Sequence, residues 1–168
     1  MTDLQSGSYD VSVSTFNVHE LIKNLVDEYS SSAKVKNLEL KLDLKLEESL
    51  FESDEYALSH ILSNLIDNSI KYTKKGVIKV SAKINNNGIL EISIADTGIG
   101  IAEEFLPNLF NTFSQEEQGY TRSYDGNGLG LALVKNYCQL ISADIKVNSI
   151  KEKGSTFTVT IPEFNNGN

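Results

Sequence analysis

Apolar residues recur along this chain with two periods, one typical of helices and one typical of strands. A first helix is predicted over about residues 18–31, beginning with a capping-box pattern at Asn17 and Glu20. Its apolar positions at helical spacing are Val18, Leu21, Leu25 and Tyr29. Strict alternation follows and predicts a strand over 38–46 whose five leucines share one buried face. These leucines are Leu38, Leu40, Leu42, Leu44 and Leu46.

A second helix is predicted to begin after Asp54, which can cap its first turn. Its apolar side consists of Leu58, Ile61, Leu62, Leu65 and Ile66. A polar stripe runs along the same helix, because His60, Asn64 and Asn68 repeat at a spacing of four residues. The regularity of this stripe makes it a candidate for function.

The second half of the chain alternates between strands and one long helix. Strands near 77–84 and 89–95 are joined by Asn85-Asn86-Asn87-Gly88, which predicts a hairpin. A glycine-rich, irregular stretch occupies about 111–128. A last helix follows, with apolar positions at Leu131, Val134, Tyr137, Cys138 and Ile141. A closing hairpin over 145–150 and 156–161 turns around Gly154. This order predicts an α+β fold, a two-layer α/β sandwich in which helices cover one face of a mixed, mostly antiparallel sheet.

Length and composition fit a single folded domain. The chain has 168 residues, of which 40% are hydrophobic and 23% charged, and no interior linker interrupts the pattern. We expect a linker over residues 1–15, one domain over 16–164 and a disordered tail over 165–168.

The charge narrows the possible partners. A net charge of −8 argues against nucleic acid, because binding to phosphate backbones needs clustered Lys and Arg. A single nucleotide remains compatible, since backbone amides and a metal ion can offset phosphate charge locally. The single cysteine, Cys138, and the lack of a membrane-spanning apolar run lead us to expect a reducing, cytoplasmic setting for this domain.

Three polar or glycine-rich segments stand out, although each alone has an ordinary structural explanation. On the second helix, the segment from Asn64 to Tyr72 places an amide that can ligate Mg²⁺ and the cation of Lys71 on one side. The second segment, 96–101, follows a strand and combines Asp96 with closely spaced glycines. The third, 126–131, precedes a helix and offers backbone N–H groups to phosphates. No strand runs directly into it, so a dinucleotide-binding βαβ unit is not expected.

In this order, the three segments resemble the N, G1 and G2 boxes of the catalytic, ATP-binding domain of sensor histidine kinases, a branch of the Bergerat-fold (GHKL) ATPases. Leu109–Gln115 is similar to the F box, and Gly154–Phe157 is similar to the short glycine motif of the last hairpin. The resemblance implies ATP and Mg²⁺ as ligands.

The resemblance also implies individual roles. Asn68 would ligate Mg²⁺ with support from Asn64, Lys71 would meet phosphate, and Tyr72 would lie near the adenine. Asn64 and Lys71 would thereby serve catalysis. Asp96 would bind the adenine amine. The other implied nucleotide-binding residues are Gly98, Gly100, Ile101, Phe113, Arg122, Gly126, Gly128, Leu129, Gly130 and Thr156. Residues 111–125 would form a lid over ATP.

The residue type at the position of Asn64 distinguishes the branches of this superfamily. In its hydrolytic members a glutamate stands at this position as the general base. An amide cannot take a proton from water near neutral pH, so transfer to an imidazole, which already has a free lone pair, is favoured over hydrolysis. Two alternatives stay open: a degenerate ATP-binding regulatory module, and a GHKL-type ATPase.

The histidine that accepts phosphate is expected on another domain. His19 lacks the continuation of the acceptor motif, and His60 is expected to pack near the start of its helix. The implied partners are a dimerisation and histidine phosphotransfer domain of the same kinase and a response regulator, with this domain alone expected to be a monomer.

Overall fold

The computed structural model describes residues 10–46, 50–110 and 128–164 of the chain. Its main sheet has five strands in the order β2-β4-β5-β7-β6. These are β2 (Leu38–Lys45), β4 (Gly76–Ile84), β5 (Leu90–Asp96), β7 (Gly154–Ile161) and β6 (Asp144–Ile150). Only the β2–β4 pair is parallel, and the other three pairs are antiparallel. The predicted mixed, mostly antiparallel sheet is therefore confirmed.

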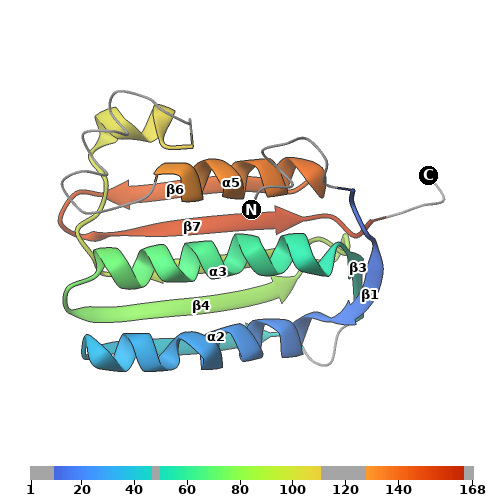
Figure 1. Ribbon diagram of the computed structural model, residues 1–168, viewed down its shortest axis with the longest axis horizontal. Coiled ribbons are helices and arrows are strands. Elements are labelled where there is room, and N and C mark those ends of the chain that lie inside the picture. Colours follow the sequence, from blue (N-terminus) through green and yellow to red (C-terminus); the bar gives the residue numbers. More distant parts are fainter. Residues whose placement is uncertain (1–9, 47–49, 111–127, 165–168) are drawn as a thin grey trace.

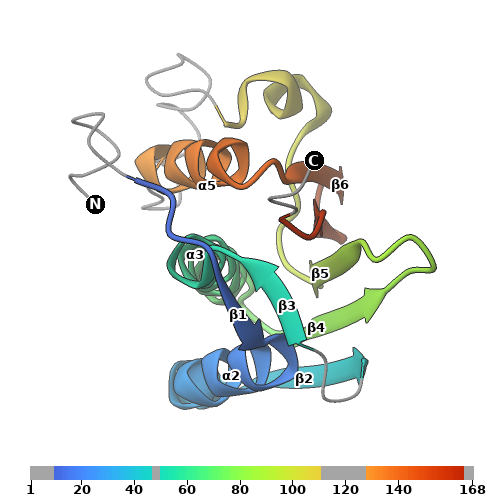
Figure 2. The ribbon, with the colours of Figure 1, turned by 90° about the vertical axis from the view of Figure 1, so that its right-hand side faces the viewer.

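Three helices cover one face of this sheet, as Figure 2 shows in a view along the sheet. They are α2 (Val18–Val35), α3 (Glu55–Tyr72) and α5 (Gly128–Leu140). Strand alternation turns every second residue toward these helices, and most of those positions are apolar and buried. In the three central strands they are Ile78, Val80, Ala82, Leu90, Ile92, Ile94, Phe157, Val159 and Ile161. The two-layer α/β sandwich predicted from the sequence is confirmed.

Helices α2 and α3 begin directly after the capping residues that the sequence predicts. The side chain of Asn17 accepts a hydrogen bond from the N–H of Glu20, and that of Asp54 accepts one from the N–H of Ala57. Helix α2 runs to Val35, four residues beyond its predicted end, and all five apolar positions predicted for α3 are buried. The leucine face of β2 is less buried than predicted, because Leu42 is 37% exposed on a strand at the edge of the sheet.

Three of the described elements, two short strands and a 3-10 helix, were not predicted. Strand β1 (Ser14–Asn17) pairs antiparallel with β3 (Leu50–Ser53) in a small ribbon near the start of α3 (Figure 1). Strand β1 begins two residues before the predicted start of the domain at residue 16, and the domain boundaries stay a prediction. A short 3-10 helix, η1 (Glu103–Asn108), follows the loop after β5. In the described ranges, no helix is long and apolar enough to cross a membrane.

Candidate functional site

A small pocket, partly open to solvent, lies where α3 ends and β5 runs into its following loop. Its walls come from α3, the segment after β5, the start of α5 and strand β7. The lining residues are Asn68, Ser69, Tyr72, Asp96, Ile99, Gly100, Ile101, Leu109, Leu131, Ser155 and Phe157. The N-box segment on α3 and the Asp96 segment, which are distant in sequence, therefore meet at one site.

Among the described residues that line this pocket, Asp96 is the one with a charged side chain. Its Oδ1 accepts hydrogen bonds from the N–H of Gly98 at 2.9 Å and from the N–H of Ser155 at 3.2 Å. Burial raises the pKa of Asp96, and these two bonds together with the Ser69 hydroxyl only partly offset that rise. Since both backbone bonds end on Oδ1, Oδ2 keeps acceptor capacity for a donor entering the pocket.

The loop after Asp96 is fixed on both sides. The N–H of Ile99 donates to Tyr72 O at 3.2 Å, and Ile99 O accepts from the N–H of Glu152 at 2.5 Å. The N–H of Ile101 donates to Ser149 Oγ at 2.7 Å. These bonds tie the loop to the end of α3 and to the β6–β7 hairpin, so the pocket is preformed on this side.

The two glycines of this segment are required by close approach to the protein itself. A Cβ on Gly98 would lie 2.4 Å from Tyr72 O, and one on Gly100 would lie 2.1 Å from Ile150 O. Gly100 also has φ +69, which disfavours a side chain. The resemblance implies that both glycines bind nucleotide, and the close contacts described here are with neighbouring backbone of the protein.

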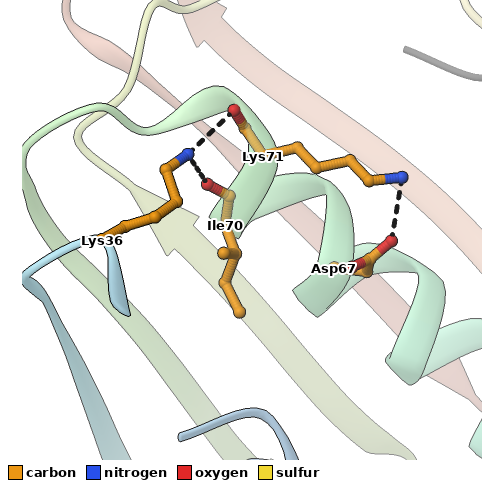
Figure 3. A network of polar contacts seen from close by, with 4 residues as sticks. All are labelled: Lys36, Asp67, Ile70 and Lys71. Atoms are coloured by element: carbon orange, nitrogen blue, oxygen red, sulfur yellow. Dashed lines mark hydrogen bonds and ion pairs between the residues drawn. The ribbon is translucent and has the colours of Figure 1, made fainter. Parts of the chain in front are cut away.

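The polar stripe of α3 divides into residues in the pocket and residues beside it. Asn68 and Tyr72 line the pocket. Asn64 lies one turn earlier and donates from Nδ2 to His60 O at 2.8 Å. Lys71 points along the helix surface, where its Nζ pairs with Asp67 Oδ2 at 3.1 Å (Figure 3). Neither Asn64 nor Lys71 lines the pocket.

Thr156, which the resemblance implies as a nucleotide-binding residue, does not line the pocket. Strand alternation places Ser155 and Phe157 on the buried side of β7 and leaves Thr156 on the other side of the sheet. The glycine motif therefore reaches the pocket through Ser155 and Phe157. The buried positions 155, 157, 159 and 161 follow from the alternation of β7, which was the signal available in the sequence.

Other predicted residues lie near the end of the described structure. Phe113, Arg122 and Gly126, together with the predicted lid over 111–125, lie outside the described residues. Gly128, Leu129 and Gly130 form the first turn of α5, so this helix begins before the position predicted from its apolar pattern. Leu131 follows in the same helix and contributes to the pocket wall.

Part of the apolar wall, Leu109 and Phe157, and the buried hydroxyl of Ser69 were not among the predicted site residues. Phe157 meets the ring of Phe110 edge to face, with ring centroids 6.3 Å apart, and Phe157 and Leu109 both line the pocket. Ser69 is 2% exposed, and its Oγ has no hydrogen-bond partner of good geometry within the described part of the chain. This hydroxyl lies at the pocket wall beside the Asp96 carboxylate, whose pKa it lowers.

The remaining candidate groups are structural. His60 packs on Tyr56 and Tyr137, with centroid distances of 4.3 and 5.4 Å, and burial lowers the pKa of His60. This packing agrees with the interpretation of His60 as a residue near the helix start. Cys138 is buried, and burial raises the pKa of its thiol to about 12, so the thiolate is not accessible.

The protein oxygen atoms at the pocket can hold a metal ion only together with a bound nucleotide. Among residues 10–46, 50–110 and 128–164, no cluster of three or more His, Cys, Asp or Glu could hold a metal. Mg²⁺ often takes one or two protein oxygens and completes its shell with phosphate and water. The side-chain oxygen of Asn68 on the pocket wall fits that mode of binding.

With this geometry described, the chain can be compared with known proteins. A family model described as "Histidine kinase-, DNA gyrase B-, and HSP90-like ATPase" matches residues 53–165. This match covers most of the chain and includes all three polar or glycine-rich segments that the sequence singles out. The chain belongs to this family. The resemblance that the ordered motifs indicated is confirmed.

Relatives and solved structures place the domain among histidine kinases. The chain is 34% identical over 166 residues to the autoinducer 2 sensor kinase/phosphatase LuxQ of Vibrio parahaemolyticus, covering 95% of this chain and 19% of that protein. It is 32% identical to the sensor histidine kinase AtsR of Burkholderia thailandensis, covering 95% and 27%. The chain thus spans about a fifth to a quarter of these relatives, which are larger sensor kinases.

The fold is shared with solved kinase structures. Full-length ShkA in complex with AMPPNP aligns with a TM-score of 0.82 and 26% identity, over 96% of this chain and 33% of ShkA. The catalytic domain of histidine kinase ThkA aligns with a TM-score of 0.77 and 22% identity, over 90% and 96%. The fold of this family domain is therefore that of histidine kinase catalytic domains.

Proposed function

We propose that this chain binds Mg²⁺-ATP in the Asp96 pocket and transfers the γ-phosphoryl group to a histidine on a separate dimerisation domain. The observation that carries the proposal is the half-satisfied carboxylate of Asp96: two backbone amides hold Oδ1, and Oδ2 has acceptor capacity left in a pocket with apolar walls. An exocyclic amine on a flat base supplies the matching donor.

The residues around the pocket suit different parts of the nucleotide. Ile101, Leu109 and Phe157 provide an apolar wall for the base, and Asn68 stands at the side from which Mg²⁺ would be held. Bound Mg²⁺ supplies charge neutralisation on the phosphates. Lys71 would have to exchange its pairing with Asp67 for phosphate, which costs little because both side chains are more than a third exposed.

Asn64 supports transfer over hydrolysis. Its amide has no proton-accepting capacity near neutral pH, and its Nδ2 is already engaged with His60 O. A neutral imidazole on a partner domain needs no such base, so positioning and electrostatics would supply most of the catalysis. The partners would be the histidine-bearing domain of the same kinase and, downstream, a response regulator.

The experiment has a binding step and a transfer step. Mg²⁺-ATP is titrated calorimetrically into the wild type and into Asn68→Ala, followed by [γ-³²P]ATP with a helical hairpin that carries the acceptor histidine. Metal-dependent binding that is weakened in Asn68→Ala, with acid-labile label only on the hairpin, supports the proposal. Binding without transfer would instead indicate an ATP-holding regulatory module, and turnover without the hairpin would indicate an ATPase.

A further inference from the structure

The last turn of α3 leaves backbone carbonyl groups that have no partner within the helix. Two of them are taken by one distant side chain. Lys36 Nζ donates to Ile70 O at 2.5 Å and to Lys71 O at 3.2 Å, as Figure 3 shows. Lys36 lies 34 and 35 residues earlier in the chain, so this contact joins two separate parts of the fold.

The next carbonyl of the same turn faces the pocket loop. Tyr72 O accepts from the N–H of Ile99 at 3.2 Å. Three successive backbone carbonyls at the end of α3 therefore accept hydrogen bonds from two different parts of the chain. The first two accept from Lys36, and the third accepts from the loop that carries Gly98 and Gly100. Because Asn68 and Tyr72 line the pocket from this turn, its position sets the width of the pocket.

Lys36 is itself held in place by a tight turn. It is the C-cap residue of α2, where its N–H donates to Ala33 O at 3.1 Å. Asn37 follows with φ 59, and its N–H donates to Lys34 O at 2.9 Å. The ammonium also complements the negative end of the α3 dipole, since cations are favoured near helix C-termini.

We propose that Lys36 is a positioning residue for the nucleotide pocket. It holds the last turn of α3 against the loop after Asp96, and so sets the distance between Asn68 and Tyr72 on one wall and Ile99 and Gly100 on the other. The inference rests on the proposed function, because the pocket is the one assigned to ATP.

The test separates positioning from stability and from long-range charge. Lys36→Met removes the donor, Lys36→Arg restores a cationic donor, and Lys34→Met removes a neighbouring exposed lysine as the matched control. Affinities for Mg²⁺-ATP and for neutral adenosine are measured well below the melting temperature of each variant. Hydrogen exchange of the Ile99 amide is followed by NMR in the absence of nucleotide.

We expect Lys36→Met to weaken binding of both ligands about fivefold and to speed exchange at Ile99, since a charge-assisted hydrogen bond at a pocket wall is lost. Lys36→Arg should recover most of the loss, and Lys34→Met should resemble the wild type. If Lys36→Met does not fold, Lys36→Gln takes its place with a smaller expected loss.

Two results would overturn the proposal. A lower melting temperature with unchanged binding and unchanged Ile99 exchange would make Lys36 a purely structural cap. An equal loss of ATP affinity in Lys36→Met and Lys34→Met, with adenosine unaffected, would assign the effect to net charge. If the wild type binds no ATP, the proposed function fails, and the exchange rate at Ile99 alone decides whether Lys36 holds the loop.

Discussion

An aspartate lies near each end of helix α3, the buried Asp54 at its start and the partly buried Asp96 of β5 near its end, and the two carboxylates are used differently. At the N-terminal end, Asp54 is 1% exposed and uses both oxygens, accepting from Ala57 N at 3.0 Å and from Ser12 N at 2.9 Å. At the C-terminal end, Asp96 receives both of its backbone bonds on Oδ1. A carboxylate whose two oxygens are engaged stabilises the fold, whereas one with an oxygen left for a ligand can serve binding at a cost in stability.

Replacing the binding carboxylate should give the largest effect. Asp96→Asn keeps an acceptor for the Gly98 and Ser155 amides but directs an N–H toward the adenine amine, so two donors would meet. We expect ATP affinity to fall about 100-fold, roughly 2.7 kcal/mol, by calorimetry. Asp43→Asn on the open face of the sheet is the control. Affinity within about threefold of the wild type would remove Asp96 from the binding site.

The stability difference between the wild type and Asp96→Asn should depend on pH. Burial raises the pKa of Asp96, so the folded state binds the proton more tightly than the unfolded chain. The wild type therefore loses stability as pH rises through this raised pKa, and Asp96→Asn does not. In urea unfolding, the variant should be the more stable protein at about pH 7, with the difference shrinking as pH falls toward about 4. A difference that grows on acidification would contradict the assigned direction.

Replacing Asp54 should lower the stability of the fold and leave ATP binding unchanged. Asp54→Ala removes the N-cap of α3 and leaves the amide of Ser12 without its acceptor, so the free energy of unfolding should fall by about 2 kcal/mol. The folded variant should bind ATP as the wild type does. Urea unfolding measures the stability, and calorimetry on the same samples measures the ATP affinity. A loss of affinity without a loss of stability would mean that Asp54, at the start of α3, also contributes to binding at the other end of the helix.

Buried hydroxyls provide a smaller test. Thr73 is fully buried, and its Oγ1 has no hydrogen-bond partner in the part of the chain that the structure describes. Thr73→Val keeps the shape and removes the unpaired polar atom, so the free energy of unfolding should rise by about 1 kcal/mol. Ser53→Ala tests the equivalent unpaired hydroxyl beside Asp54. A clear loss of stability in Thr73→Val would show that a water molecule satisfies this hydroxyl.

The smallest effect is expected away from both ends of α3. Ser142 ends α5 with φ 58, and the N–H of Ala143 donates to Cys138 O at 2.8 Å, as in a Schellman cap. Ser142→Gly relieves the left-handed conformation and should raise the melting temperature, with a gain of about 0.5–1 kcal/mol and unchanged ATP affinity. Thermal unfolding measures the gain, and a loss would mean that the serine side chain stabilises this turn.

Most of the fold followed from periodicity. The apolar faces of α2 and α3, the two hairpins and both helix caps were visible in the order of residues, because each depends on local spacing. The β1–β3 ribbon was not, since its short strands lack an alternating pattern and are specified by pairing between distant segments. The parallel pairing of β2 with β4 is equally non-local, although a mixed sheet was predicted.

The site was predictable in its residue types but only partly in its geometry. Asp96, Asn68, Tyr72, Gly100 and Ile101 were named from the motifs and meet at one pocket. Asn64 and Lys71 make local contacts on α3, and Thr156 was one residue away from Ser155. Whether a residue contacts the pocket depends on the direction of its side chain. A motif predicts that direction only when it is combined with the periodicity of the helix or strand that carries it.

The central claim, that Asp96 accepts a hydrogen bond from the adenine amine, is tested most directly by a double-mutant cycle between protein and ligand. Wild type and Asp96→Asn are each titrated with ATP and with purine riboside triphosphate, which lacks the amine. We expect the missing amine to weaken binding to the wild type by about tenfold or more and to cause no loss with Asp96→Asn, giving a clear coupling energy. Equal losses in both proteins would contradict the account and place the base elsewhere.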